Sequence, residues 1–292
     1  MNSRILLPSQ FEAQDLFETI SGSFGRFEEV PDGVVFDFQN LRFVRPSGIV
    51  FLSNLTKYLA RKGCNVVFEN MQLGSQCIRF LDDSLFFQQH VGNKLNATSS
   101  PRVTTQPLVE VQHSESHDWV RNTFVPWLSD CSDIEQHDLS ELATCLSELF
   151  NNIDDHTEYD VGSIFAQWYP QEERVIVSIA DFGAGIPSTV GRVCSGLSDT
   201  NAIKKAFEDE FTSRSTPRNR GIGLYFLLQN VVQNLGGKLE VHSAGGAVIF
   251  KMVGDTLSIV PYNHNGFCPG TLIDIEFNTA AIERTEGELE DI

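Results

Sequence analysis

Three polar residues lie one helical turn apart in a segment whose apolar spacing predicts a long helix. Leu, Ala, Phe and Ile side chains of residues 138–156 share one arc of that helix, and Glu148, Asn152 and His156 follow one another along its rim, about 40° apart. A carboxylate at Glu148 can take a proton from a nucleophile, and the amide oxygen of Asn152 can bind Mg²⁺. The alternative is the ordinary polar edge of an amphipathic helix.

A second polar group follows an apolar segment. Residues 174–180 alternate as a strand does and lead directly into Asp181, Gly183 and Gly185. An aspartate at a strand end can accept a hydrogen bond from an exocyclic amine, and glycines let the backbone approach a flat ring closely. A glycine-rich turn capped by an aspartate is the plainer alternative.

A third group precedes a helix that we predict over residues 224–235. Gly221 and Gly223 lie just before Leu224, the first residue of this helix. Three arginines, the last of them Arg220, fall between residues 214 and 220. The free N–H groups and the positive dipole end of a helix N-terminus attract phosphate oxygens, which arginines can clamp. This segment therefore predicts an anion site.

The order of the three groups resembles the GHKL ATPase superfamily, which includes gyrase, mismatch-repair ATPases, sensor histidine kinases and anti-sigma-factor serine kinases. The resemblance rests on ELFNNIDDHT, DFGAGIP, and RGIGL followed by GGKLEV, and it extends over residues 138–277. It implies an α/β fold of the GHKL two-layer sandwich type, with a mostly antiparallel sheet and helices on one face. It also implies ATP and Mg²⁺ as cofactors.

The same resemblance implies a role for each matching residue. Glu148 would be the general base, Asn152 the Mg²⁺ ligand and Asp181 the reader of the adenine amino group, with Thr271 near the adenine. The glycines of the second group would begin the nucleotide lid, and those of the third would lie under the phosphates. The residues expected to contact the nucleotide are Asn152, His156, Asp181, Gly183, Gly185, Arg220, Gly221, Gly223, Leu224 and Thr271.

Residues 1–92 are predicted to form a smaller α/β domain. Strands over 34–38 and 65–69 flank a helix over 47–62 that Gly63 ends, an order that predicts a parallel strand pair. This strand, loop and helix resemble the STAS fold of anti-sigma-factor antagonists, although Arg45 and Pro46 replace an Asp-Ser pair. The resemblance makes Ser47 a candidate phosphosite, and the alternative is a simple helix start.

Residues 93–112, rich in Asn, Ser, Thr and Pro, predict a linker between the STAS-like domain and a GHKL-type domain over 113–280. An acidic tail over 281–292 follows. We predict two strands over 238–243 and 247–252, joined by a hairpin at Gly245-Gly246, and a last strand over 271–277. Between them, residues 253–267 are predicted as a loop, and we place Tyr262, His264 and Cys268 among loop residues.

The composition limits the function. The 292 residues carry 21 Lys and Arg against 39 Asp and Glu, a net charge of −18 that disfavours direct nucleic-acid binding. No apolar run approaches the roughly 18–20 residues of a membrane span, so we expect a cytoplasmic protein without a membrane partner.

We predict a regulatory protein of signal transduction that transfers the γ-phosphoryl group of ATP to a protein serine or to water. The alternative is an ATP-gated interaction module with little turnover, whose partner protein is unknown and whose homodimerisation is left open.

Overall fold

The computed structural model describes residues 2–24, 30–154, 161–209, 211 and 222–284. Its N-terminal part contains a parallel sheet of three strands in the order β1-β3-β5 and a short parallel pair, β2-β4. The elements are β1 (Asn2–Leu6), β2 (Gln10–Phe11), α1 (Ala13–Phe24), β3 (Gly33–Asp37), β4 (Phe43–Val44), α2 (Pro46–Arg61), β5 (Asn65–Glu69), α3 (Gln76–Asp83) and α4 (Phe86–Val91). The predicted parallel pair is confirmed, because Val34 of β3 lies opposite Val66 of β5.

Helix α2 is buried around most of its circumference. Twelve of its residues are buried, because the helix packs against β5 of the small sheet and also against β7, β8 and β10 of a larger sheet. A helix that is apolar on all sides is typical of such a central position. The helix ends as predicted at Gly63, whose φ is +84° and whose N–H donates to the carbonyl of Ala60 at 3.0 Å.

The C-terminal part is built on a five-stranded sheet in the order β6-β7-β8-β10-β9, in which all neighbours are antiparallel. Its strands are β6 (Thr105–Gln112), β7 (Val161–Tyr169), β8 (Arg174–Asp181), β9 (Lys238–Val253) and β10 (Thr256–Asn278). Its helices are α5 (His113–Trp119), α6 (Val125–Ser132), α7 (Ser140–Asp154), α8 (Ile186–Gly191), α9 (Asp199–Ala206) and α10 (Ile222–Leu227), with π-helical turns over Val120–Phe124 and Leu228–Asn234 and short 3₁₀ turns over Gln136–Leu139, Pro170–Glu172 and Thr279–Ala281. This confirms the predicted α/β fold class.

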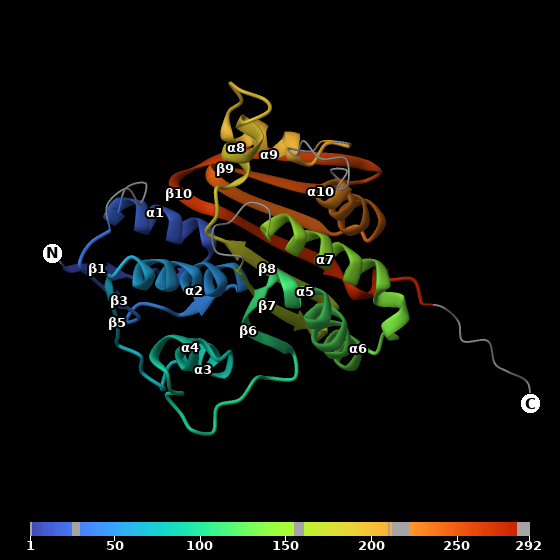
Figure 1. Cartoon of the computed structure of the whole chain (residues 1–292). Coiled ribbons are helices and arrows are strands. Elements are labelled where there is room, and N and C mark those ends of the chain that lie inside the picture. Colours follow the sequence, from blue (N-terminus) through green and yellow to red (C-terminus); the bar gives the residue numbers. More distant parts are fainter. Residues whose placement is uncertain (1, 25–29, 155–160, 210, 212–221, 285–292) are drawn as a thin grey trace, which may run out of the picture.

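Strand alternation sends the side chains of the large sheet to two different cores. Val177 and Ile275 belong to a core shared with α7, α10 and the other C-terminal helices. Phe165, Ala180 and Leu272 belong to the core of the N-terminal part. The N-terminal elements accordingly gather on one side of the molecule, and α7 and α10 lie on the other (Figure 1). Helices were expected on one face of this sheet, and α1 and α2 also cover part of the opposite face.

Part of the predicted linker is a strand. Residues 105–112 form β6, which pairs antiparallel with β7 at the edge of the large sheet. The register shifts between Gln106 and Val109, around Pro107. Proline lacks the N–H that a central strand would need and is therefore confined to edges and bulges, so the residue that suggested a linker marks an edge strand instead.

The predicted hairpin at Gly245-Gly246 is wrong. Strand β9 runs through both glycines, and the chain reverses at Gly254, whose φ is +59°, and Asp255, between the paired residues Val253 and Thr256. A two-residue turn of this kind joins antiparallel strands without splaying them. The earlier glycine pair serves close packing, because a Cβ at Gly246 would lie 2.8 Å from the backbone nitrogen of Thr200 in α9.

The predicted loop over 253–267 is mostly strand. Strand β10 begins at Thr256 and contains Tyr262, His264 and Cys268 in addition to the predicted strand over 271–277. Its irregular segment packs tightly on α1, since a Cβ at Gly266 would collide with the backbone of Phe17. The hairpin was missed because its outer strand lacks clean alternation in the sequence. Within the described residues, no helix is both long and apolar enough to cross a lipid bilayer.

Candidate functional site

Asp181 ends β8 on the face of the large sheet that the C-terminal helices cover. Only 7% of the residue is exposed. Its carboxylate accepts the backbone N–H of Gly183 at 2.6 Å and that of Thr271. Burial raises the pKa of Asp181 to about 7, and these two backbone hydrogen bonds limit the rise. Near neutral pH, this side chain can therefore serve as a buried hydrogen-bond acceptor.

The turn after Asp181 is held by a serine that sequence reasoning missed. Ser243 Oγ accepts the backbone N–H of Ile186 at 3.0 Å and donates to the carbonyl of Gly270 at 2.6 Å. Gly185 and Gly270 have φ values of +76° and +73°, in the region that favours glycine. A Cβ at Gly270 would also collide with the backbone of Asp181. The glycine directly before Thr271 was the available signal for this close approach.

Thr271 lies beside Asp181 at the end of the large sheet. It is opposite Asp181 of β8 on one side and opposite Ser243 of β9 on the other. Thr271, Asp181, Gly183 and the turn at Gly185 therefore form one continuous group at the end of the sheet, although residues 181 and 271 are far apart in the sequence.

Glu148 lies on α7 and is partly buried. Asn152 follows one turn later on the same helix, but its side chain is outside the described part of the structure, and His156 lies outside the described residues altogether. The helix backbone therefore fixes the spacing of Glu148 and Asn152 and leaves their contacts open.

Gly223 and Leu224 lie in the first turn of α10, which packs against α7 on the same sheet face. Leu224 is partly buried against the helical core. Arg220 and Gly221 lie outside the described residues, as do the other arginines of the predicted anion site. The helix predicted over 224–235 is confirmed as α10 and the π-helical turn that continues it to Asn234.

The N-terminal part contacts the end of β8 that carries Asp181. The amide nitrogen of Asn54 on α2 donates to the carbonyl of Ala180 at 2.8 Å, and Asn54 Oδ1 accepts the hydroxyl of Ser163. The ring of Phe182 packs against the rings of Phe51 and Tyr58 on α2, and the centroids of Phe182 and Phe51 are 5.4 Å apart. Sequence reasoning missed this contact, since a polar residue within an apolar helix gives no indication of its distant partner.

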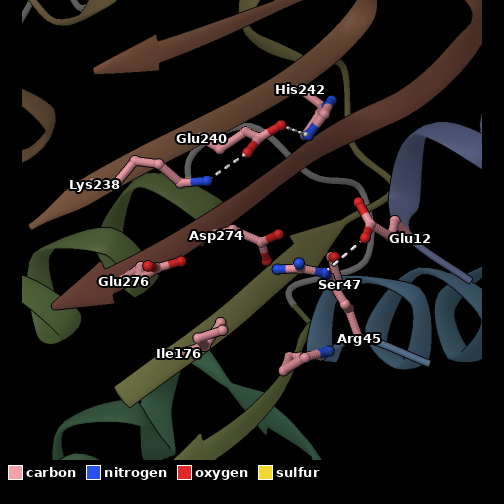
Figure 2. A pocket seen from close by; sticks show the side chains of 10 residues that line it. Glu12, Arg45, Ser47, Ile176, Lys238, Glu240, His242, Asp274 and Glu276 are labelled. Carbon is pink, nitrogen blue, oxygen red and sulfur yellow. Dashed lines mark hydrogen bonds and ion pairs between the residues drawn. The ribbon is translucent and has the colours of Figure 1, made fainter. Parts of the chain in front are cut away.

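Ser47 lies in a small cavity between α2 and the large sheet (Figure 2). The residue is 2% exposed, and its side chain bonds to Asp274, which also accepts the hydroxyl of Ser178. Burial raises the pKa of Asp274 to about 6. The cavity measures about 50 Å³ and is lined by Glu12, Arg45, Pro46, Ser47, Ile176, Lys238, Glu240, His242, Asp274 and Glu276.

Carboxylates outnumber cations around this cavity, and the cations are already paired. Arg45 Nε lies 2.7 Å from Glu12, and Lys238 Nζ lies 3.0 Å from Glu240. Although burial opposes the ionisation of Glu240, its hydrogen bonds and the neighbouring His242 and Lys238 hold its pKa well below the usual range. A phosphate on Ser47 would therefore meet negative charge in this arrangement.

The residues at the end of β8 fit an adenine better than they fit a metal ion. Asp181 supplies a buried acceptor, and the turn beside it contains the partly exposed Gly183 and the exposed Ala184. Among the described residues, no group of three or more His, Cys, Asp or Glu side chains is arranged to hold a metal ion. The predicted Mg²⁺ ligand, Asn152, would depend on phosphate oxygens and water for the rest of its coordination.

Comparisons with known proteins bear on the second half of the chain. Residues 137–256 match the family model described as histidine kinase-, DNA gyrase B-, and HSP90-like ATPase. The match includes Glu148, Asp181 and Leu224 and ends before Thr271, while Ser47 lies ahead of it. No curated protein matches the chain. The family match supports the resemblance of residues 137–256 to GHKL-type ATPases and supports ATP binding by this protein.

Proposed function

We propose that the protein is a cytoplasmic regulatory protein that binds Mg-ATP between α7, the end of β8 and the first turn of α10. The observation that carries this proposal is the buried carboxylate of Asp181, held by the backbone N–H groups of Gly183 and Thr271. An acceptor fixed in this way can bind the exocyclic amine of adenine and reject a base that presents a carbonyl there.

Glu148 would perform the chemistry from α7. Its carboxylate accepts the proton of a water molecule or a protein serine as the oxygen attacks the γ-phosphorus of ATP, and the bond to ADP breaks on the opposite side. Asn152 would hold Mg²⁺, which when bound would supply positive charge to neutralise the phosphates. The free N–H groups at the start of α10 would contact the same phosphates.

A second candidate function is an ATP-gated interaction module with little turnover. The contacts of α2 with the end of β8 that carries Asp181 favour this second function. Asn54 and Phe182 couple the N-terminal layer to the peptide next to Asp181. A nucleotide that shifts this strand end would change how α2 is held and thus alter a surface for another protein.

Ser47 of the STAS-like part remains a proposed phosphoacceptor, but only from an open arrangement. In the folded chain its hydroxyl is buried and bonded to Asp274. The start of α2 must therefore leave the large sheet before phosphate can reach Ser47. Mass spectrometry after incubation with Mg-ATP tests this, and an unmodified Ser47 under all conditions, cell extract included, would leave the N-terminal part as a docking layer.

The decisive experiment incubates the pure protein with γ-labelled ATP and Mg²⁺ and separates released phosphate from protein-bound label. Loss of turnover in Glu148→Ala, with nucleotide affinity within a few fold of the parent, supports phosphoryl transfer. Lys251→Ala is the control, because Lys251 is exposed on the distant part of β9. Binding of ATP without turnover in the parent favours the gated module, and no ATP binding contradicts both functions.

A further inference from the structure

A second cavity lies within the N-terminal half of the chain, away from the nucleotide residues. It measures about 480 Å³, which is within the range of roughly 300–1,000 Å³ typical of small-molecule sites. Helix α3 forms one wall, and the segment that leads toward β6 forms the other. All of the lining residues are polar: Gln76, Arg79, Asp83, Asn96, Thr98, Ser99 and Arg102.

The loop wall of this cavity is rigidly held by a buried carboxylate. Asp82 has no exposed surface, and its two oxygens accept the backbone N–H groups of Leu95 at 2.8 Å and Asn96 at 2.9 Å. It also accepts the hydroxyl of Ser99 at 2.6 Å. The amide oxygen of Asn96 in turn accepts the backbone N–H of Thr98 at 3.1 Å. The polar groups of this wall are thus in place before a ligand arrives, which reduces the entropy cost of binding.

Two arginines make the cavity cationic in an acidic protein. Arg102 Nε lies 3.1 Å from Asp83, and its guanidinium lies 5.0 Å from the ring centroid of Phe80, so one edge of the group is anchored while further N–H donors remain. Arg79 is exposed, and its side chain makes no hydrogen bond or ion pair with the described residues. Two arginines against one aspartate give the lining a net charge of +1 in a chain whose net charge is −18.

We propose that this cavity binds a small phosphomonoester that carries hydroxyl groups. Arginine donors match phosphate oxygens, and the amide and hydroxyl side chains of Gln76, Asn96 and Thr98 suit the hydroxyls of such a ligand. No aromatic or aliphatic side chain lines the cavity within the described residues, so a nucleobase or an acyl chain would find little apolar contact there. The site shares no residue with the proposed ATP site.

The test is calorimetric titration of the full chain with ribose 5-phosphate in magnesium-free buffer, alongside ribose and inorganic phosphate. We expect ribose 5-phosphate to bind, inorganic phosphate to bind more weakly and ribose not to bind. Arg79→Ala should weaken ribose 5-phosphate binding about tenfold or more, because each lost charge-assisted hydrogen bond removes affinity of that order. Lys251→Ala removes the same charge from an exposed distant site and should change the affinity less than about twofold.

Arg79 is exposed, so its replacement leaves the fold intact, and Arg102→Ala gives a second, independent loss. The proposal is overturned if ribose 5-phosphate fails to bind at millimolar concentration, or if Arg79→Ala binds it as the parent does, which would place binding elsewhere. Equal weakening in Arg79→Ala and Lys251→Ala would also overturn it, since a general charge effect would then account for the binding.

Discussion

The two faces of the large sheet each hold one aspartate with a raised pKa, but the two carboxyl groups are held by different donors. Asp181, on the helical face, accepts backbone N–H groups from Gly183 and Thr271. Asp274, on the opposite face, accepts the hydroxyls of Ser178 and Ser47. Backbone donors are positioned by the strand register and the turn, whereas the Ser47 donor is present only while α2 is docked.

This difference assigns the two faces different tasks. A carboxylate held by its own backbone keeps its geometry when a ligand arrives, as a binding site requires. A carboxylate held by a helix from another layer reports whether that layer is docked. Under the proposed function, the helical face would therefore carry the nucleotide chemistry, and the N-terminal face would couple the two layers.

The largest expected effect tests whether chemistry is confined to the helical face. Glu148→Ala should reduce phosphoryl transfer by about 10²–10⁴-fold, the usual contribution of a general base. Asp274→Asn, on the other face, should leave the rate within a few fold. Turnover with labelled ATP measures both variants. Equal losses in the two would show that the faces do not divide the work.

The next prediction tests whether the side chains on both faces of the large sheet are packed in stable cores. Ile275 and Leu272 are fully buried on opposite sides of β10. Replacing either with alanine should lower the free energy of unfolding by about 2–5 kcal/mol, measured by urea denaturation. Glu276→Ala, at a partly exposed ion pair with Arg174, should change it by less than about 1 kcal/mol. A small loss for Leu272→Ala alone would mean that the N-terminal layer is only loosely docked.

Nucleotide affinity should depend on pH through Asp181. Its pKa of about 7 means that the group is protonated below that pH, and a neutral carboxyl group is a weaker acceptor for the adenine amine than a carboxylate. ADP affinity should therefore fall as the pH drops below about 7, by up to tenfold per pH unit. Asp181→Asn should bind ADP about tenfold more weakly at pH 8 and lose this dependence. Calorimetry from pH 5.5 to 8 decides it, and an unchanged profile in the variant would remove Asp181 from adenine recognition.

The smallest effect concerns the stability contributed at Asp274. Its pKa of about 6 exceeds the ordinary value of 3.8, so the folded state holds this proton to higher pH than the unfolded chain does. Stability should fall as the pH rises from about 4 to 6 and then level off. The Asp274→Asn variant lacks this pH dependence. Its free energy of unfolding, relative to that of the parent, should therefore be about 1–2 kcal/mol higher at pH 8 than at pH 4. Urea titrations at both pH values test it, and a constant difference between the two proteins would contradict the assignment.

Local patterns in the sequence determined several elements of this protein without tertiary information. The apolar spacing of α2 and the glycine after it predicted that helix and its end, because periodicity and a positive φ are properties of neighbouring residues. Asp181 was predicted at the end of β8 for the same reason, and the structure has it there.

Only the tertiary structure decided what those elements contact. Asn54 and Ala180 are 126 positions apart, and no local pattern pairs them. Gly246 has the composition of a turn but lies within β9, because α9 packs against the place where its side chain would be. Ser47 lies in the first turn of α2, as local patterns predicted, yet its burial against Asp274 depends on a strand more than two hundred residues later. Register and layer packing bring such pairs together, and both are set by the whole chain.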